Sequence, residues 1–274
     1  MGGHCMTVGI GLLCDQGKHI LLAADMRANY GGISQNDQTG KLFDLPFNFC
    51  GAISGAIGWC GEIISELHWR MGKIPEAQLG AEKIREAILD SYTRIYLMLS
   101  DQELRNRLKI SLDQYQHDKK LVPRMRLAAN ELLQTIEVDV DLIVAGFIKA
   151  GPIQFVAQGG TSVKIHPEVT PGNAVIGSGA TAALNWLNYR KQNYSCGLAR
   201  SLLHLTEAKQ FAEVEQTVGQ LRQIALIQPG GWKGLEGGDA MIQEWWNRYG
   251  LPLSDGLQQE KYNQSFRDTF GLTS

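Results

Sequence analysis

Three residues in the first part of the chain, Asp25, Lys41 and Gly55, are of types that together could cleave an amide bond. Asp25 ends an apolar run, Lys41 opens a short strand-like segment, and Gly55 closes another. A carboxylate can orient a buried lysine and offset its charge. A glycine allows its backbone N–H to approach a tetrahedral oxyanion closely. Such a group still needs a nucleophile.

Two residues near the start of the sequence, Cys5 and Thr7, are candidate nucleophiles. The first residue of a chain can use its own α-amino group as a general base, because the ordinary pKa of that amine is about 7.7–8.0. A nearby lysine helps the hydroxyl to lose its proton and keeps the amine neutral. The sequence therefore predicts a nucleophilic amide-cleaving site. Thr7 is favoured, although strand alternation does not separate it from Cys5, since residues 5, 7 and 25 share parity.

Composition predicts a globular protein without affinity for nucleic acid or membranes. The 274 residues are 44% hydrophobic and 20% charged, and the formal net charge is -2. No apolar run reaches the roughly 20 residues that span a bilayer, and the N-terminus lacks the features of a signal peptide. Five widely spaced cysteines without a CxxC pair favour a reducing compartment, and six histidines show no metal-ligand spacing. We therefore expect a cytoplasmic protein with no metal site.

The apolar pattern predicts strands, two helices, strands, two helices and a last strand. Strands are expected at 7–14, 19–25, 41–45, 49–54, 138–148, 154–156, 163–166, 174–176 and 224–227, and helices at 57–69, from 75 onward, at 181–189 and at 198–212. Residues 28–40 are expected to form a polar loop, and the charged residues 100–136 a helical excursion. This order suits an α+β fold with helices packed outside two sheets, and not a repeating βαβ fold.

The stretch from Thr7 to Ala28 resembles the opening of proteasome β-type subunits, which belong to the N-terminal-nucleophile hydrolases. In that family a strand from an N-terminal threonine leads to an Ala-Asp-x-Arg motif, and residues 24–27 here are Ala-Asp-Met-Arg. The spacings from Asp25 to Lys41 and on to Gly55 resemble the family's without a gap. The similarity covers roughly 7–99 and 138–227, and it extends in particular to the single-type bacterial proteins called Anbu, or ancestral β subunits.

The resemblance implies a four-layer αββα sandwich of two antiparallel sheets flanked by helices. It also implies a threonine-type peptidase that forms an acyl-enzyme. Thr7 would be the nucleophile, with Asp25 and Lys41 as its charged partners. Gly55 would supply the oxyanion donor and Ser178 a supporting hydroxyl. No cofactor is implied, the substrates would be peptides or unfolded proteins, and copies of the chain would assemble into a ring or an open ring.

The chain departs from the family pattern around the nucleophile. Its first hairpin is longer, and Thr7 is not the first residue as written, so residues 1–6 would be an N-terminal extension or a propeptide. If translation started at Met6, removal of that residue would expose Thr7. Glu215 falls where the family has an aspartate, and Val218 where it has a second serine. The second difference removes a hydroxyl from the polar network around the amine.

The predicted organisation is one proteasome-like domain over 7–230, with a helical insertion at about 100–136 and a C-terminal extension over 231–274. Two other functions fit the same residues. One is a ring-forming homologue without activity, and the other is an amidohydrolase that acts on small amides instead of peptides.

Overall fold

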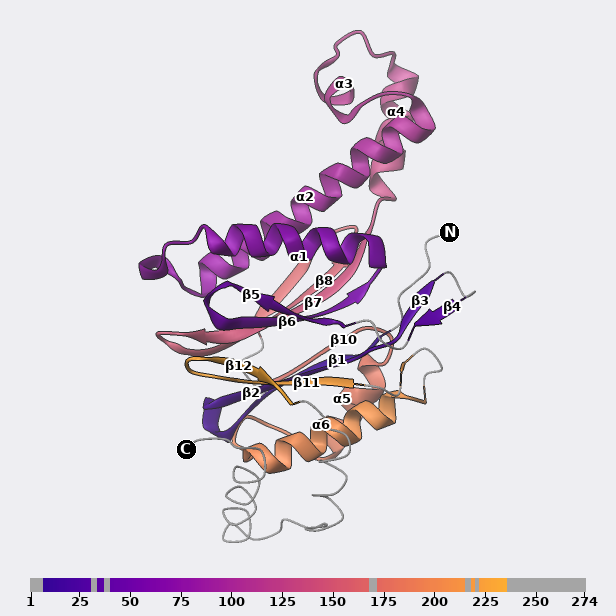
Figure 1. Cartoon of the computed structure of the whole chain (residues 1–274). Helices are drawn as coiled ribbons and strands as arrows, with labels where there is room; N and C mark the ends of the chain where they lie inside the picture. Colours follow the sequence, from indigo (N-terminus) through magenta and orange to yellow (C-terminus); the bar gives the residue numbers. More distant parts are fainter. Residues whose placement is uncertain are drawn as a thin grey trace.

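The chain is an α+β protein, as its sequence predicts. The computed structural model describes residues 7–30, 34–36, 40–167, 172–214, 218–219 and 222–235. Within these ranges it contains two five-stranded antiparallel sheets, a two-stranded ribbon and six α-helices (Figure 1).

The first sheet contains the two earliest strands at its centre. Its strand order is β10-β1-β2-β11-β12. The bounds are β1 Gly9–Cys14, β2 His19–Asp25, β10 Asn173–Ile176, β11 Arg222–Gln228 and β12 Gly231–Gly234. Alternate residues of β2 belong to different core clusters: Leu21 and Ala23 pack with α5 and α6, whereas Leu22 packs with residues of the second sheet. The two helices are α5 Ala180–Tyr189 and α6 Leu198–Ala212.

The second sheet has the order β5-β6-β7-β8-β9. The bounds are β5 Leu42–Leu45, β6 Phe49–Gly55, β7 Val138–Ile148, β8 Gly151–Gly160 and β9 Lys164–Pro167. Helices α1 Ile57–Gly72 and α2 Ala81–Leu108 share a core cluster with one face of these strands (Figure 1). The other face contributes Ala52 and Ile143 to the cluster that also contains Leu22, so an apolar core joins the two sheets.

The predicted helical excursion comprises the end of α2 together with α3 Leu112–His117 and α4 Pro123–Gln134. It has a small core of its own around Leu104, Ile110 and Ala129. Figure 1 shows these helices extending away from the sheets. Because α2 is continuous from Ala81, the excursion begins inside a helix that also packs on the second sheet.

Three predicted elements differ from the structure. The strand expected at 154–156 is the centre of the longer β8, Gly151–Gly160, because the glycines and the proline at its ends hide it from a strand pattern. The helix expected from Pro75 begins at Ala81, because Pro75 precedes only a short 3-10 turn and Gly80 has an extended backbone. The expected loop at 28–40 contains a short ribbon of β3 Ala28–Tyr30 and β4 Ser34–Asn36, a polar hairpin that apolar alternation does not reveal. The predicted C-terminal extension starts with β12, which pairs with β11, and from residue 236 onward it lies outside the described residues, as do residues 1–6.

Candidate active site

Thr7, Asp25 and Lys41 meet at one end of the two sheets. Thr7 precedes β1 and Asp25 ends β2, and the antiparallel register of these strands brings their ends together. Lys41 precedes β5 in the other sheet, and its Nζ donates to Asp25 Oδ1 at 3.1 Å and to Thr7 Oγ1. Thr7 and Asp25 are fully buried, and Lys41 is 5% exposed. The fold thus brings the predicted nucleophile, lysine and carboxylate into direct contact.

The Asp25 carboxylate is held by donors from separate parts of the chain. Its Oδ1 accepts from the backbone N–H of Val8 at 3.1 Å as well as from Lys41. Its Oδ2 accepts from the backbone N–H of Arg27 at 3.2 Å and of Gly219 at 2.9 Å. Hydrogen bonds to an ionised acceptor are stronger than neutral ones. Each oxygen of the carboxylate thus has two donors, and its charge offsets the burial of the Lys41 ammonium.

A glutamine side chain from the first sheet fixes the backbone of Lys41 in the second. Gln223 of β11 is paired with Ala24, beside Asp25, and its Oε1 accepts from Lys41 N at 2.9 Å and from Leu42 N at 3.2 Å. Nothing in the sequence indicates this role, because a lone glutamine in a strand carries no motif and its partners lie far away along the chain. These two hydrogen bonds hold the Lys41 backbone in place and so determine the position from which its side chain extends.

The backbone of Thr7 is enclosed by the turn that follows β10. Its carbonyl accepts from Gly179 N at 3.3 Å and from Ser178 Oγ at 3.4 Å. Gly177 has a φ of +86, and a Cβ there would lie 2.1 Å from Thr7 O. Ser178 therefore lies beside Thr7 and contacts its carbonyl, and its role as a supporting hydroxyl stays a prediction. The turn holds the Thr7 backbone while the side chain reaches Lys41.

Asp141 of β7 supports the same turn and was not singled out from the sequence. Its carboxylate accepts from Gly159 N at 3.2 Å and from the backbone N–H of Gly177. Burial raises the pKa of Asp141 above its ordinary value, and the two backbone donors partly oppose that rise. The available signal was a carboxylate that opens the apolar run 141–147. Through Gly177, the second sheet thus contacts the turn around Thr7.

Gly55 ends β6 in a conformation that requires glycine. Its φ is +130, and a Cβ would lie 2.2 Å from Asp139 O. The preceding residue, Ser54, lies against the turn described above, because a Cβ on Gly177 would be 2.9 Å from Ser54 Oγ. Gly55 therefore directly follows Ser54, the residue that lies against that turn. Its role as oxyanion donor stays a prediction.

The sequence also identified Cys5 as an alternative nucleophile and Glu215 at the family's aspartate position. Cys5 and Glu215 lie outside the described residues. Burial raises the pKa of the Cys50 thiol to about 12, and burial raises that of Cys14 further. Only a thiolate is strongly nucleophilic, so these two cysteines are inert near neutral pH.

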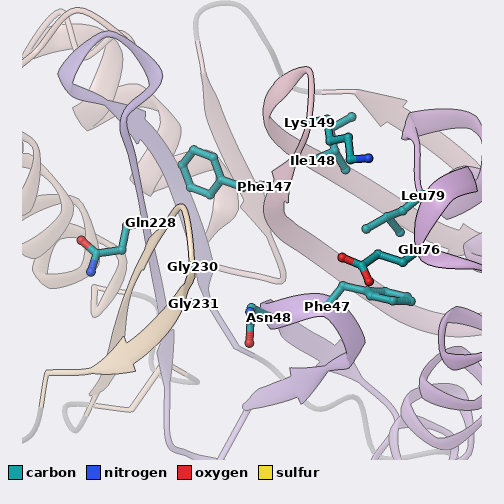
Figure 2. A pocket seen from close by; sticks show the side chains of 10 residues that line it. All are labelled: Phe47, Asn48, Glu76, Leu79, Phe147, Ile148, Lys149, Gln228, Gly230 and Gly231. Carbon is teal, nitrogen blue, oxygen red and sulfur yellow. The ribbon is translucent and has the colours of Figure 1, made fainter.

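A cavity of about 350 Å³ lies at the opposite end of the sheets from Thr7 (Figure 2). Its walls are the turns before β6, between β7 and β8, and between β11 and β12, whereas Thr7 lies near the end of β6. Figure 2 shows its charged side chains, Glu76 and Lys149, and both are exposed. The cavity is therefore separate from the buried ion pair.

Comparison with models of known protein families gave no match, and comparison with curated proteins gave none either. Among the described residues, no helix is both long enough and apolar enough to cross a bilayer. The same residues contain no group of three or more His, Cys, Asp and Glu side chains that could hold a metal ion. Function is therefore inferred from the geometry around Thr7.

Proposed function

We propose that this chain hydrolyses peptide bonds through Thr7 as an N-terminal nucleophile. The observation that carries the proposal is Lys41 Nζ, which lies in hydrogen-bond contact with both Thr7 Oγ1 and Asp25 Oδ1 inside the protein. This placement puts a fixed positive charge where a threonine alkoxide would develop, in an environment that strengthens electrostatic interactions.

The reaction has two halves. The hydroxyl oxygen of Thr7 attacks the substrate carbonyl carbon, and the α-amino group of Thr7 takes the hydroxyl proton. The tetrahedral intermediate collapses, the C–N bond breaks, and the leaving amine takes the proton, which leaves an ester on Thr7. Water then attacks this ester, and the α-amino group of Thr7 takes a proton from the water. The second tetrahedral intermediate collapses, the C–O bond to Thr7 breaks, and the Thr7 oxygen takes that proton from the amine, which releases the acid and restores the Thr7 hydroxyl. Lys41 stabilises the negative oxygen of Thr7, Asp25 holds Lys41, and the Gly55 N–H is assigned to the substrate oxyanion.

The proposal requires a free amine on Thr7. In the printed sequence six residues precede Thr7, so its nitrogen is a peptide nitrogen, and its side chain is fully buried. Removal of residues 1–6, or a start at Met6 followed by loss of that methionine, would supply the amine. Intact-mass spectrometry of the purified protein should therefore find a population that begins at Thr7.

The fold and the expected assembly belong to the same proposal. Two antiparallel sheets that share a core cluster, each packed with its own pair of helices, support a four-layer αββα sandwich. Together with the residues around Thr7, they support membership of the proteasome β-type family near its Anbu branch. The chain would then work in the cytoplasm as a homo-oligomeric ring or open ring.

A panel of aminocoumarin peptide amides tests the activity. We expect turnover by the parent protein, and Thr7→Ala and Lys41→Ala should each lower kcat/KM by about a thousandfold or more. Thr93→Ala is the matched control, because this exposed threonine lies on α2 and donates only to the Leu89 carbonyl of its own helix in the contacts described. It should leave kcat/KM unchanged.

The other outcomes each point to a different conclusion. If no population begins at Thr7 or Cys5, the catalytic proposal fails and the alternative of a ring-forming homologue without activity is favoured. Turnover of small amides but not of peptides would indicate an amidohydrolase. Activity that survives Thr7→Ala but not Cys5→Ala would move the nucleophile to Cys5.

A further inference from the structure

Lys209 is a buried lysine on the opposite side of Asp25 from Lys41. It lies in the last turn of α6 and is 1% exposed. The neighbouring positions on this face, Leu205, Ala208 and Ala212, belong to the apolar core. Lysine is almost never fully buried unless it is paired. Among the contacts of the described residues, its Nζ donates to Glu213 Oε1 at 2.5 Å and to the Gly219 carbonyl at 2.6 Å.

The Gly219 residue connects Lys209 to the candidate active site. Its carbonyl accepts from Lys209 Nζ, while its backbone N–H donates to Asp25 Oδ2 at 2.9 Å. A Cβ on Gly219 would lie 2.6 Å from the Arg27 Cβ, so the backbone is packed closely against the end of β2. Hydrogen bonds arranged in series polarise one another. Lys209 therefore fixes and polarises a direct donor to Asp25.

The charges around Lys209 are consistent with this connection. Burial is the main cause that lowers the pKa of Lys209, and the Arg222 guanidinium lowers it further. Glu213 and Asp25 act in the opposite direction and raise it. Lys209 thus interacts electrostatically with Asp25 as well as through Gly219.

A purely structural explanation accounts for only part of these contacts. Lys209 and Glu213 are four residues apart on α6, a spacing at which ion pairs stabilise helices, and a cation suits a helix C-terminus. Such a pair works equally well on an exposed face. It explains neither the burial of Lys209 nor its bond to Gly219, which belongs to a different segment of the chain.

We propose that Lys209 is a positioning residue of the reaction: through the Gly219 peptide it orients Asp25, and through Asp25 it keeps Lys41 at Thr7. This inference rests on the proposed function for its catalytic consequence. The family resemblance assigns a serine to position 218, where this chain has a valine that is buried in the apolar core. Lys209 provides the polar anchor for that segment from the neighbouring helix.

Three substitutions in the full chain test the proposal. Lys209→Met keeps the length of the side chain but removes its charge and donors. Glu213→Gln removes the charge of the helical ion pair and leaves the bond from Lys209 to Gly219. Lys83→Met is the matched control, since Lys83 is half-exposed on α2 and pairs with Glu86 at 2.6 Å.

Two measurements separate positioning from stability. The first is kcat and KM for an aminocoumarin peptide amide that the parent turns over. Because Lys209 does not touch substrate, Lys209→Met should lower kcat by about 10- to 100-fold with KM unchanged within about twofold. Glu213→Gln and Lys83→Met should keep kcat within about threefold of the parent.

The second measurement, amide hydrogen exchange, does not depend on activity. The N–H groups of Gly219 and Val8 both donate to Asp25, so Lys209→Met should speed exchange at both, whereas Glu213→Gln and Lys83→Met should not. Unchanged exchange at both amides in Lys209→Met, or equal effects of Lys209→Met and Glu213→Gln on kcat, would overturn the proposal. If the parent turns over no amide, the proposed function fails, and hydrogen exchange alone decides whether Lys209 holds Asp25.

Discussion

At the scale of single residues, the Asp25 carboxylate connects separate segments of the candidate site. It accepts from the Lys41 ammonium and from the backbone N–H groups of Val8, Arg27 and Gly219. Each of these hydrogen bonds to the carboxylate comes from a donor, so the site accommodates an acceptor-only side chain. This property separates a carboxylate from its amide isostere, which must present an NH₂ group to one of the donors.

Asp25→Asn should therefore destabilise the protein strongly. The substitution leaves Lys41 as a buried cation without its counter-ion and places an NH₂ group against backbone N–H donors. We expect the free energy of unfolding to fall by about 3–5 kcal/mol, measured by urea denaturation. Asp44→Asn is the control, because Asp44 is exposed and accepts from Trp232 Nε1, and it should lose less than about 1 kcal/mol. Equal losses in the two variants would contradict this account.

The residues that the sequence identified are those that carry local chemistry. Asp25, Lys41 and Thr7 stand at predicted strand ends, and the structure brings them into contact. Lys209 and Gln223 were not identified because their roles depend on partners that are distant in sequence. A lysine on the apolar face of α6 was the one available signal for Lys209. No comparable signal existed for the amide of Gln223.

At the scale of elements, the end of β6 shows how a strand sets the shape of the site. Gly55 has a φ of +130, a region that strongly favours glycine, and its Cα faces the backbone of β7. A similar φ of +126 occurs at Gly151, where nothing lies within 4 Å of an added Cβ. The two glycines therefore differ in the space around an added Cβ, while their φ angles are nearly equal.

This pair of glycines separates backbone strain from crowding. Gly151→Ala should cost only the strain of a positive φ, about 1–3 kcal/mol. Gly55→Ala has that strain and also brings a Cβ to 2.2 Å from Asp139 O, so β6 and β7 must separate where the site is built. We expect its free energy of unfolding to fall by at least about 2 kcal/mol more than that of Gly151→Ala. If urea denaturation gave similar losses of unfolding free energy for the two variants, the separation of β6 from β7 would carry no cost and this prediction would be contradicted.

Element boundaries followed from the sequence wherever one pattern was dominant. β7 and α6 have the predicted bounds, Val138–Ile148 and Leu198–Ala212, because an apolar strand and a long apolar helix face are unambiguous. The start of α2 was wrong because Gly80, and not Pro75, sets its N-terminus. The apolar pattern therefore predicted the existence of these elements well and the residues at which they begin less well.

At the scale of the whole molecule, the site joins the two sheets. Lys41 belongs to one sheet and its partners Asp25 and Gln223 to the other, while Asp141 reaches from the second sheet to the turn around Thr7. No local signal could predict these contacts, since the pairing of the sheets arises from apolar burial over the whole chain. The geometry of the site consequently depends on the global fold, and conditions that weaken the fold should also disturb the site.

His204 makes the global fold sensitive to acid. It lies on α6, is 2% exposed, and its Nδ1 is 2.8 Å from Gln192 Oε1. The Nε2 of Gln192 donates to Ser201 Oγ and Asn193 O, so its Oε1 is the acceptor and the imidazole proton is assigned to Nδ1. Burial, aided by the charges of Arg200 and Arg190, lowers the pKa of His204 to about 3. The folded protein therefore keeps this ring neutral.

The consequence for stability follows from proton binding. The ordinary pKa of His is 6.5, so between pH 6.5 and about 3 the unfolded chain binds a proton that the folded chain does not. The free energy of unfolding should fall as the pH drops through this window, by about 1.4 kcal/mol per unit at most, and should keep its full value above pH 6.5. His204→Gln removes the contribution of this histidine to the pH dependence. Between pH 7 and pH 4.5, the fall in the free energy of unfolding of His204→Gln, measured by urea denaturation, should therefore be smaller than that of the parent by at least about 2 kcal/mol. His117→Gln, at an exposed histidine, should retain the parent's drop, and an unchanged drop in His204→Gln would show that this ring is protonated in the folded state.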